Sequence, residues 1–234
     1  MNKPNQRSAD GHEDGVTITP KMEDYLRRIY RLQQESEGRV SNSNLAETLD
    51  VTRATVTSML DTLSSRGLID WQRYRPVRLT AKGEATALQV LRRHRLVETM
   101  LAELFGYALS EVDAEADVLE HHISSRLCQT IEQELGMPQT DPHGDPIPDS
   151  DLDIDRTTDV SSLPTVAESS TVEVTRLLSQ DEEILEYLVS LGIEPGKTLS
   201  LDEITPIGMI TVTVESTARQ ANLPRRIASH VLVK

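Results

Sequence analysis

Three runs of helical hydrophobic spacing, joined by short polar turns, fill residues 19 to 67 and restrict this part of the chain to a small helical domain. The first run opens at Thr19-Pro20, where threonine can cap a helix and proline suits the first helical position, and it continues until Gly38. A short second run follows, and after a tight turn Thr52 can cap a third helix that stops at Gly67. The sequence therefore predicts a helix, a short helix, a tight turn and a helix, in that order.

A basic hairpin is predicted directly after the third helix. Residues 68–71 and 77–80 have the composition of two strands around the turn Arg73-Tyr74-Arg75-Pro76. This order is typical of a winged helix-turn-helix domain, in which the third helix lies in the major groove of DNA and the wing touches the backbone. The pattern favours this interpretation over a small helical domain with a solvated hairpin tip. The residues expected to contact DNA are Thr52, Arg53, Ala54, Thr55 and Ser58 on the third helix, with Arg73 and Arg75 on the wing.

Charge is distributed unevenly along the 234 residues. Residues 1–100 carry a net charge of +3 and residues 101–234 carry −17, which gives −14 for the whole chain. A mildly basic front half on an acidic rear half fits a DNA reader with a separate sensing or assembly region. The basic residues are 19 Arg and only 5 Lys, and an acidic excess with so little lysine resembles proteins from salt-rich cytoplasms. Surface charges are screened within about 3 Å at 1 M salt, so such a protein can still approach DNA.

The composition predicts a soluble protein of the cytoplasm. Cys128 is the only cysteine, which excludes an intramolecular disulfide and a Cys-based zinc or iron–sulfur site. No run approaches the roughly 18 consecutive apolar residues of a membrane span, and the polar N-terminus lacks the apolar core of a signal peptide. We therefore expect no membrane contact, and we expect residues 1–18 to form a disordered tail.

C-terminal to the hairpin, the apolar residues return to helical spacing, and a β-rich segment follows. A long helix is expected from Thr80 to Gly106 and another from Ser110 to Leu135, with a break near residues 122–124. Five prolines then cluster in one segment, and alternation over residues 209–214 suggests a strand of a small barrel. The expected fold is mainly α with a small β part. Its expected parts are the tail (1–18), the winged helix-turn-helix domain (19–82), a helical domain (83–137), a linker (138–168) and a small β unit (169–234).

Acidic and imidazole side chains recur at helical spacing in the helical domain. Asp117, Glu120 and His121 stand at i, i+3 and i+4, and Asp113 lies one turn earlier on the same face. On the preceding helix, His94 and Glu98 are also one turn apart. Such a stripe repels itself unless it is solvated or neutralised by a cation, and both interpretations stay open on spacing alone. His143 lies in a predicted loop, where nothing in the spacing marks it as a ligand, and Cys128 is expected to be structural.

Four segments resemble the metal-dependent repressors typified by the diphtheria toxin repressor and the manganese transport regulator. They occur in that family's order and approximate spacing, and together they cover about residues 20–234. The segments are Met22-Glu23-Asp24-Tyr25-Leu26, Arg93-His94-Arg95-Leu96-Val97-Glu98, Asp117-Val118-Leu119-Glu120-His121-His122, and Pro142-His143-Gly144-Asp145-Pro146-Ile147-Pro148. The resemblance implies a winged-helix domain, a helical dimerisation domain with the metal site, and a C-terminal SH3-like domain.

The resemblance also implies two metal sites. By position, a primary site would use Asp24, Asp117, Glu120 and His121, and an ancillary site would use His94, Glu98, Asp113 and, from the C-terminal domain, Asp181. Two of the primary positions are aspartates where the iron-responsive branch typically has Met and Cys. Oxygen ligands with one imidazole favour Mn²⁺, with Fe²⁺ as the alternative.

The function that follows is a metal-dependent regulator of manganese or iron homeostasis genes, a repressor with the divalent metal as co-repressor. It would bind a double-stranded operator as a homodimer, and it would not be an enzyme. Three rivals are a winged-helix regulator of a non-metal ligand, an adaptor acting through the C-terminal barrel, and a metal-dependent hydrolase, for which no separate nucleophile is evident near the motif. Apolar positions that could serve dimerisation are Leu101, Leu104, Phe105, Ile123 and Leu127.

Overall fold

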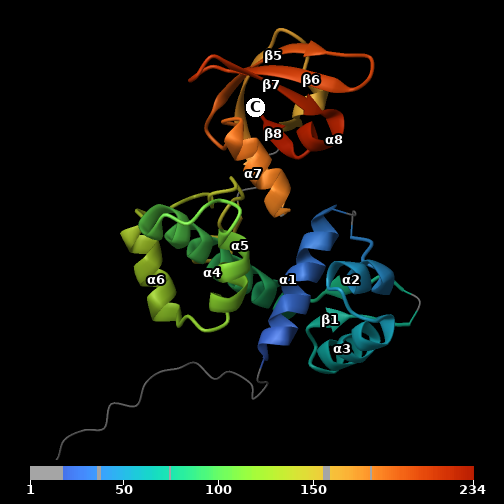
Figure 1. Cartoon of the computed structure of the whole chain (residues 1–234). Helices are drawn as coiled ribbons and strands as arrows, with labels where there is room; N and C mark the ends of the chain where they lie inside the picture. The colour runs from blue at the N-terminus through green and yellow to red at the C-terminus, as the bar shows by residue number, and fades with distance from the viewer. Residues whose placement is uncertain (1–17, 36–37, 74, 155–158, 180) are drawn as a thin grey trace, which may run out of the picture. The chain divides into compact units, whose positions relative to one another are not determined.

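The chain divides into two compact units, residues 1–86 and residues 87–234. A computed structural model describes residues 18–35, 38–73, 75–154, 159–179 and 181–234 (Figure 1). The predicted tail therefore lies outside the described residues, apart from Ile18.

The first unit contains the three predicted helices. They are α1 (Pro20–Glu35), α2 (Asn42–Thr48) and α3 (Arg53–Ser65). The hydroxyl of Thr52 caps α3 by accepting a hydrogen bond from the backbone N–H of Thr55, at 3.1 Å, as the sequence predicted. Between α2 and α3, Asp50 takes a left-handed conformation with φ 48°, which closes the tight turn. The buried side chains Leu26, Ile29, Leu45, Val56, Leu60 and Leu63 supply the apolar faces of these helices.

A short hairpin completes the winged helix-turn-helix unit. Strands β1 (Ile69–Asp70) and β2 (Arg78–Leu79) pair antiparallel, and the described residues between them, 71–73 and 75–77, belong to the wing. Val77 also bridges to Val40, so the α1–α2 connection runs beside the base of the wing. Gly83, in the first turn of the next helix, packs directly on the backbone of Leu68, where a Cβ atom would lie 1.8 Å from the carbonyl oxygen.

Three helices open the second unit. They are α4 (Ala81–Phe105), whose first residues belong to the first unit, α5 (Val112–Leu119) and α6 (Ser125–Glu134). The predicted break near residues 122–124 is confirmed, because Ser124 starts α6 as its capping residue. Val97 and Leu101 of α4 pack with α5, whereas Leu96 packs with Cys128 of α6. No helix among the described residues is both long enough and apolar enough to cross a membrane.

The segment after α6 has more structure than a linker. Thr140 bridges to Pro146, and Asp141, His143 and Ile147 are buried. Ile147 joins the apolar cluster of α4 and α6. The proline-rich composition predicted a linker, but packing on α4 fixes residues 139–148 in a way that composition does not reveal.

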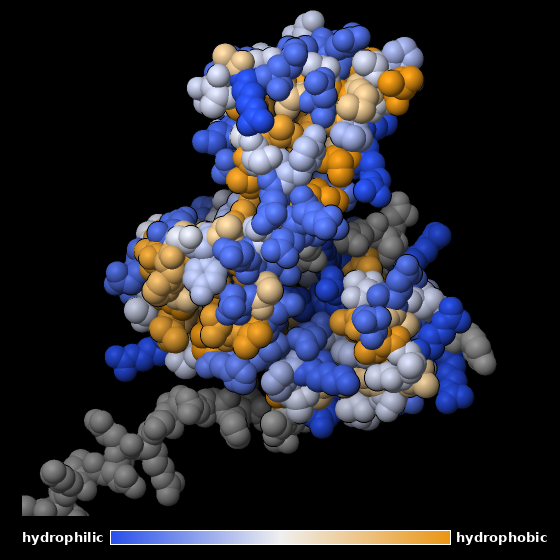
Figure 2. Space-filling model, in the orientation of Figure 1, coloured by the Kyte–Doolittle hydropathy of each residue, from blue (hydrophilic) through white to orange (hydrophobic). Residues whose placement is uncertain are grey.

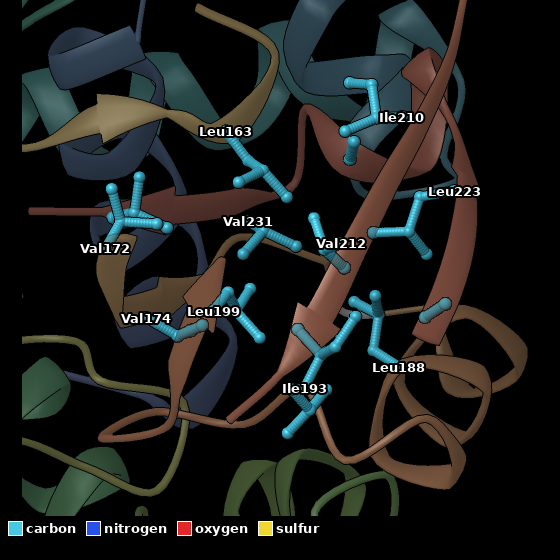
Figure 3. Packing of buried hydrophobic residues seen from close by; sticks show 14 of the residues in the cluster. Leu163, Val172, Val174, Leu188, Ile193, Leu199, Ile210, Val212, Leu223 and Val231 are labelled. Carbon is cyan, nitrogen blue, oxygen red and sulfur yellow. The ribbon is translucent and has the colours of Figure 1, made fainter. Parts of the chain in front are cut away.

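The C-terminal part is an antiparallel sheet with short helices. In the order β3-β8-β4-β5-β6-β7 it contains β3 (Ser161–Ser162), β8 (Val231–Val233), β4 (Thr171–Leu177), β5 (Thr198–Ile204), β6 (Met209–Val214) and β7 (Arg219–Pro224). Three short helices accompany the sheet, namely η1 (Leu163–Thr165), α7 (Glu182–Ser190) and α8 (Arg225–Ala228). Figure 3 shows their common core, where Leu163 and Leu188 meet valines and leucines of the strands, Val212 and Leu199 among them.

Candidate metal centre and DNA-binding surface

Four carboxylates surround the buried imidazole of His94 on α4. Its Nδ1 lies 2.7 Å from Oε2 of Glu120 and 3.4 Å from Oδ1 of Asp117. Its Nε2 lies 3.4 Å from Oε1 of Glu98 and 3.3 Å from Oδ1 of Asp113. Because both ring nitrogens face acids, the imidazole either carries two N–H groups or gives one nitrogen to a cation.

Helical spacing on α4 and α5 creates this arrangement. His94 and Glu98 are one turn apart on α4, Asp113 and Asp117 are one turn apart on α5, and Glu120 is the C-cap residue of α5. Between the two helices lies an apolar cluster that holds them together, formed by Val97, Leu101, Val112 and Ala116. The predicted stripe forms one wall of the site and is only partly solvated, since Glu120 is fully buried and Asp113 is half-buried, whereas Asp117 is exposed.

A second acid–imidazole group adjoins the first at Glu98. Ligand atoms of Glu98, Asp141 and His143 lie within 4.8 Å of one another, and all three residues are buried. Nδ1 of His143 is 3.5 Å from Oε1 of Glu98, and its Nε2 is 3.2 Å from the carbonyl oxygen of Leu109. A carbonyl can only accept, so the neutral ring carries its hydrogen on Nε2 and presents a lone pair on Nδ1. A metal-ligating histidine typically has this arrangement, with its other nitrogen donating to a backbone carbonyl.

The loop that carries His143 is shaped by Asp141. One carboxylate oxygen of Asp141 accepts hydrogen bonds from the backbone N–H groups of His143 and Asp145, each at 2.9 Å. Gly144 follows with φ 86° and packs on β4, where a Cβ atom would lie 1.9 Å from the carbonyl oxygen of Thr175. The N–H of Leu177 on β4 donates to the carbonyl of His143 at 2.8 Å. The C-terminal sheet therefore supports the loop that positions this histidine.

Burial and neighbouring charges act on the two carboxyls of the second group in opposite directions. Burial raises the pKa of Glu98, but the attraction and hydrogen bond of His94, together with the attraction of His143, outweigh it, so this pKa lies below its usual range. Burial raises the pKa of Asp141 well above its usual range, and repulsion from Glu98 and Asp145 adds to the effect against the attraction of Arg95. A cation at this group would favour the ionised form of Asp141.

The donor atoms of both groups suit a divalent ion of intermediate hardness. They are carboxylate oxygens and imidazole nitrogens, and Cys128 is placed in an apolar cluster with Leu96 and Ile131 instead. Such a set fits Mn²⁺ or Fe²⁺ better than a thiophilic metal. Across the two groups, the oxygen donors belong to Glu98, Asp113, Asp117, Glu120 and Asp141. The nitrogen donors belong to His94, His121 and His143.

Six of the eight predicted ligands lie together in the second unit. They are His94, Glu98, Asp113, Asp117, Glu120 and His121, the last with Nε2 3.4 Å from Oε1 of Glu120. Asp24 lies half-buried on α1 of the first unit, so its predicted ligation stays a prediction. The structure does not bring Asp181 into either group: it caps α7, where its carboxylate accepts the N–H of Ile184 at 3.2 Å.

Sequence reasoning missed Asp141 and His143 as candidate ligands. Both are separated from Glu98 by more than 40 residues, so no helical spacing connects them. A signal was nevertheless present, because Asp-Pro-His-Gly-Asp places acids and an imidazole among turn residues that fix the backbone.

The predicted DNA-contacting residues lie on the surface of the first unit. Thr52, Arg53, Ala54, Ser58, Arg73 and Arg75 are exposed and Thr55 is half-buried. The Thr52 and Thr55 hydroxyls are partly engaged at the start of α3, whereas Arg53 and Ser58 are exposed polar side chains on the same helix. Between α3 and the wing lies a cleft of about 880 Å³, which Arg53, Ser58, Arg73 and Arg75 help to line.

Three protein-family models match successive segments of the chain. Residues 17–77 match the N-terminal DNA-binding domain of iron-dependent repressors, residues 80–149 match their metal-binding and dimerisation domain, and residues 162–234 match the FeoA domain. The iron-dependent repressor IdeR of Mycobacterium tuberculosis is 30% identical over 228 residues, covering 93% of this chain and 98% of its own. The diphtheria toxin repressor of Corynebacterium efficiens is 33% identical over 207 residues, covering 84% of this chain and 88% of its own.

Solved structures agree with these relatives. A manganese-dependent transcriptional repressor in complex with manganese superposes with a TM-score of 0.82 at 36% identity, covering 91% of this chain and 98% of its own. The fold and the buried acid–imidazole site define a metal-dependent, DNA-binding transcriptional repressor. The chain belongs to the iron-dependent repressor family.

Proposed function

We propose that Mn²⁺, with Fe²⁺ as the alternative, is the co-repressor of this chain and controls its binding to operators of metal-homeostasis genes in the cytoplasm. The observation that carries the proposal is the buried group around His94, where four carboxylate oxygens lie within 3.4 Å of the ring nitrogens. Two of these acids, Glu98 and Glu120, are buried, and buried acids beside one another are costly without a compensating cation. The printed names of two similar proteins, the iron-dependent repressor IdeR and the manganese-dependent transcriptional repressor, link them to iron and to manganese.

The proposed switch links the two units through the metal. Asp24 on α1 would add a carboxylate from the first unit to Asp117, Glu120 and His121 of the second, which fixes the DNA-binding unit relative to the dimerisation helices. A bound ion supplies the positive charge that relieves repulsion among these acids. Metal can act only through its different affinity for the fixed and the free arrangement, and a coupling of about 1–3 kcal/mol would change DNA affinity roughly 5- to 150-fold.

The ancillary site is proposed at His94, Glu98 and Asp113, as the resemblance implies, with Asp141 and His143 added beside Glu98 in place of Asp181. The two additions are supported by the lone pair on Nδ1 of His143 and by the burial of Glu98, Asp141 and His143. Leu177 of β4 bonds to this loop, so the C-terminal domain would stabilise the ancillary site through backbone contacts.

A homodimer would place two recognition helices on one operator. Figure 2 shows apolar side chains exposed over the helices of the second unit. Among the predicted positions, Leu104, Phe105 and Leu127 are exposed by 54%, 65% and 46%, whereas Leu101 and Ile123 pack within the unit. Val118, at 61% exposure, adds to this surface. An apolar surface of this kind is suited to a partner copy.

Affinity selection of genomic DNA fragments tests the proposal directly. The purified chain is presented with fragments at high potassium chloride in parallel with Mn²⁺, with reduced Fe²⁺ and with a chelator. We expect one inverted-repeat sequence to be enriched only with metal. Equal enrichment with chelator would leave a DNA-binding protein without a metal switch, and no enrichment would contradict DNA binding itself.

Two substitutions separate the metal site from the DNA surface. Asp117→Ala should abolish the metal response, whereas Arg53→Ala should abolish DNA binding and leave metal uptake intact. Both side chains are exposed, so neither change should affect folding. An operator affinity that is independent of metal in the unmodified chain would overturn the proposed switch.

A further inference from the structure

The cleft between α3 and the wing is more strongly basic than the predicted contact residues alone suggest. Four arginines line it, namely Arg39, Arg53, Arg73 and Arg75, against one carboxylate, Asp61. All four arginines are exposed. Among the residues that the structure describes, none of the four guanidinium groups forms an ion pair. The cleft thus carries positive charge that no neighbouring acid neutralises fully.

Arg39 comes from outside the helix-turn-helix and the wing. It lies in the α1–α2 connection, and the N–H of Val77 donates to the carbonyl of Val40 at 2.8 Å, which ties this connection to the second strand of the wing. The backbone pairing therefore fixes Arg39 at the edge of the cleft, facing the same space as the arginines of the wing.

The geometry of a winged helix determines what can enter such a cleft. When the third helix lies in the major groove and the wing reaches past the backbone, the sugar–phosphate strand that separates the two grooves has to pass between helix and wing. We propose that this cleft seats one sugar–phosphate strand of the operator, with Arg39 as an additional phosphate-binding residue and Trp71 beneath the strand. The inference rests on the proposed function, because it specifies how the same surface holds DNA.

Trp71 supports this assignment. It lies directly after β1, lines the cleft and is half-buried, and its indole N–H is buried with no hydrogen-bond partner among the described residues. An unpaired buried donor is unfavourable, and a phosphate oxygen or an ordered water brought by the strand would supply the missing acceptor. The aromatic ring offers an apolar surface for the sugar.

Tryptophan fluorescence tests occupancy of the cleft, because Trp71 is the only tryptophan of the chain. The full chain, saturated with Mn²⁺, is titrated with a duplex of about 30 base pairs recovered from the genomic selection, which is long enough for two half-sites one helical turn apart. We expect the emission of Trp71 to change with the same midpoint as fluorescence anisotropy of a labelled duplex. Emission that stays constant through saturation would overturn the inference.

Arg39→Gln tests the proposed phosphate contact, with Arg78→Gln as the matched control. Arg78 is an exposed arginine on β2 that does not line this cleft, so both variants lose one positive charge at a similar place. Arg39→Gln should weaken binding about tenfold, the value typical of a charged hydrogen bond, and should reduce the slope of log affinity against log salt by about 0.9. Arg78→Gln should change both quantities much less.

The outcomes separate this inference from the proposed function. If the two variants behave alike while the unmodified chain still binds DNA only with metal, the strand does not contact Arg39 and the inference fails alone. If the unmodified chain binds DNA equally with chelator, or not at all, the proposed function fails instead.

Discussion

One backbone contact fixes the orientation of the His143 ring so that its other nitrogen is available to a metal ion. Its Nε2–H donates to the carbonyl of Leu109, so rotation of the ring would break this hydrogen bond and turn Nδ1 away from Glu98. A ring held in this way needs no reorganisation when a cation arrives at Nδ1. Preorganisation of this kind increases affinity because less side-chain freedom is lost on binding.

His143→Ala should therefore reduce the number of Mn²⁺ ions bound per chain by one without abolishing binding at the His94 group. Metal content after equilibrium dialysis measures this directly. His122→Ala is the control, because His122 is exposed and belongs to neither acid–imidazole group. Unchanged stoichiometry in His143→Ala, measured at Mn²⁺ concentrations that saturate the unmodified chain, would remove the ancillary site from the proposal.

At the scale of elements, the start of α4 packs closely on the base of the hairpin, at Leu68 and Leu79. A Cβ on Gly83 would lie 1.8 Å from the carbonyl oxygen of Leu68 and 3.3 Å from Cδ2 of Leu79, and backbone atoms cannot yield as a flexible side chain can. The N–H of Gly83 also donates to the hydroxyl of Thr80, which caps the helix. Only glycine permits this packing.

Gly83→Ala should accordingly destabilise the first unit by about 1–3 kcal/mol, although alanine is normally the better helix former. Chemical denaturation followed by circular dichroism measures the change. The control is Glu84→Ala, an exposed position in the same turn, which should lie within about 0.5 kcal/mol of the unmodified chain. A stabilised Gly83→Ala protein would show that α4 can move away from β1 at little cost.

The elements differ in how far sequence determines them. The first residues of α1 and α3 were predictable because Thr19-Pro20 and Thr52 act locally, through capping hydrogen bonds at the start of each helix. Strands β5 and β7 were not assigned, because they are defined by pairing with distant partners, such as Leu199 with Val172, and not by a local pattern. For the same reason the acids and imidazoles of α4 and α5 were found by spacing, whereas Asp141 and His143 depended on tertiary contacts.

At the scale of the whole molecule, the exposed apolar surface of the dimerisation helices predicts a change of assembly. Phe105→Glu should convert a dimer into a monomer, because a buried unpaired carboxylate at a subunit interface is strongly unfavourable. Phe105 is 65% exposed, so the isolated fold should remain intact. Sedimentation equilibrium measures the mass, and Ile207→Glu, at an 88% exposed turn of the C-terminal sheet, provides an equally apolar control. A dimeric Phe105→Glu protein would move the interface elsewhere.

The charge distribution predicts an unusual response of DNA binding to salt. An interface that neutralises Z phosphates loses affinity with a slope of about −0.9Z in log salt. Here the −17 charge of residues 101–234 also repels DNA over long distances, and salt removes that repulsion first, because the Debye length falls from about 10 Å at 0.1 M to about 3 Å at 1 M. We therefore expect affinity for the selected operator to fall only slightly between these concentrations, as measured by fluorescence anisotropy in potassium chloride.

The triple change Glu182→Gln, Glu183→Gln and Glu186→Gln removes three exposed charges of α7 and should make this decline in affinity steeper. A steep decline in the unmodified chain, equal to that of the triple variant, would show that the acidic half does not influence the approach to DNA.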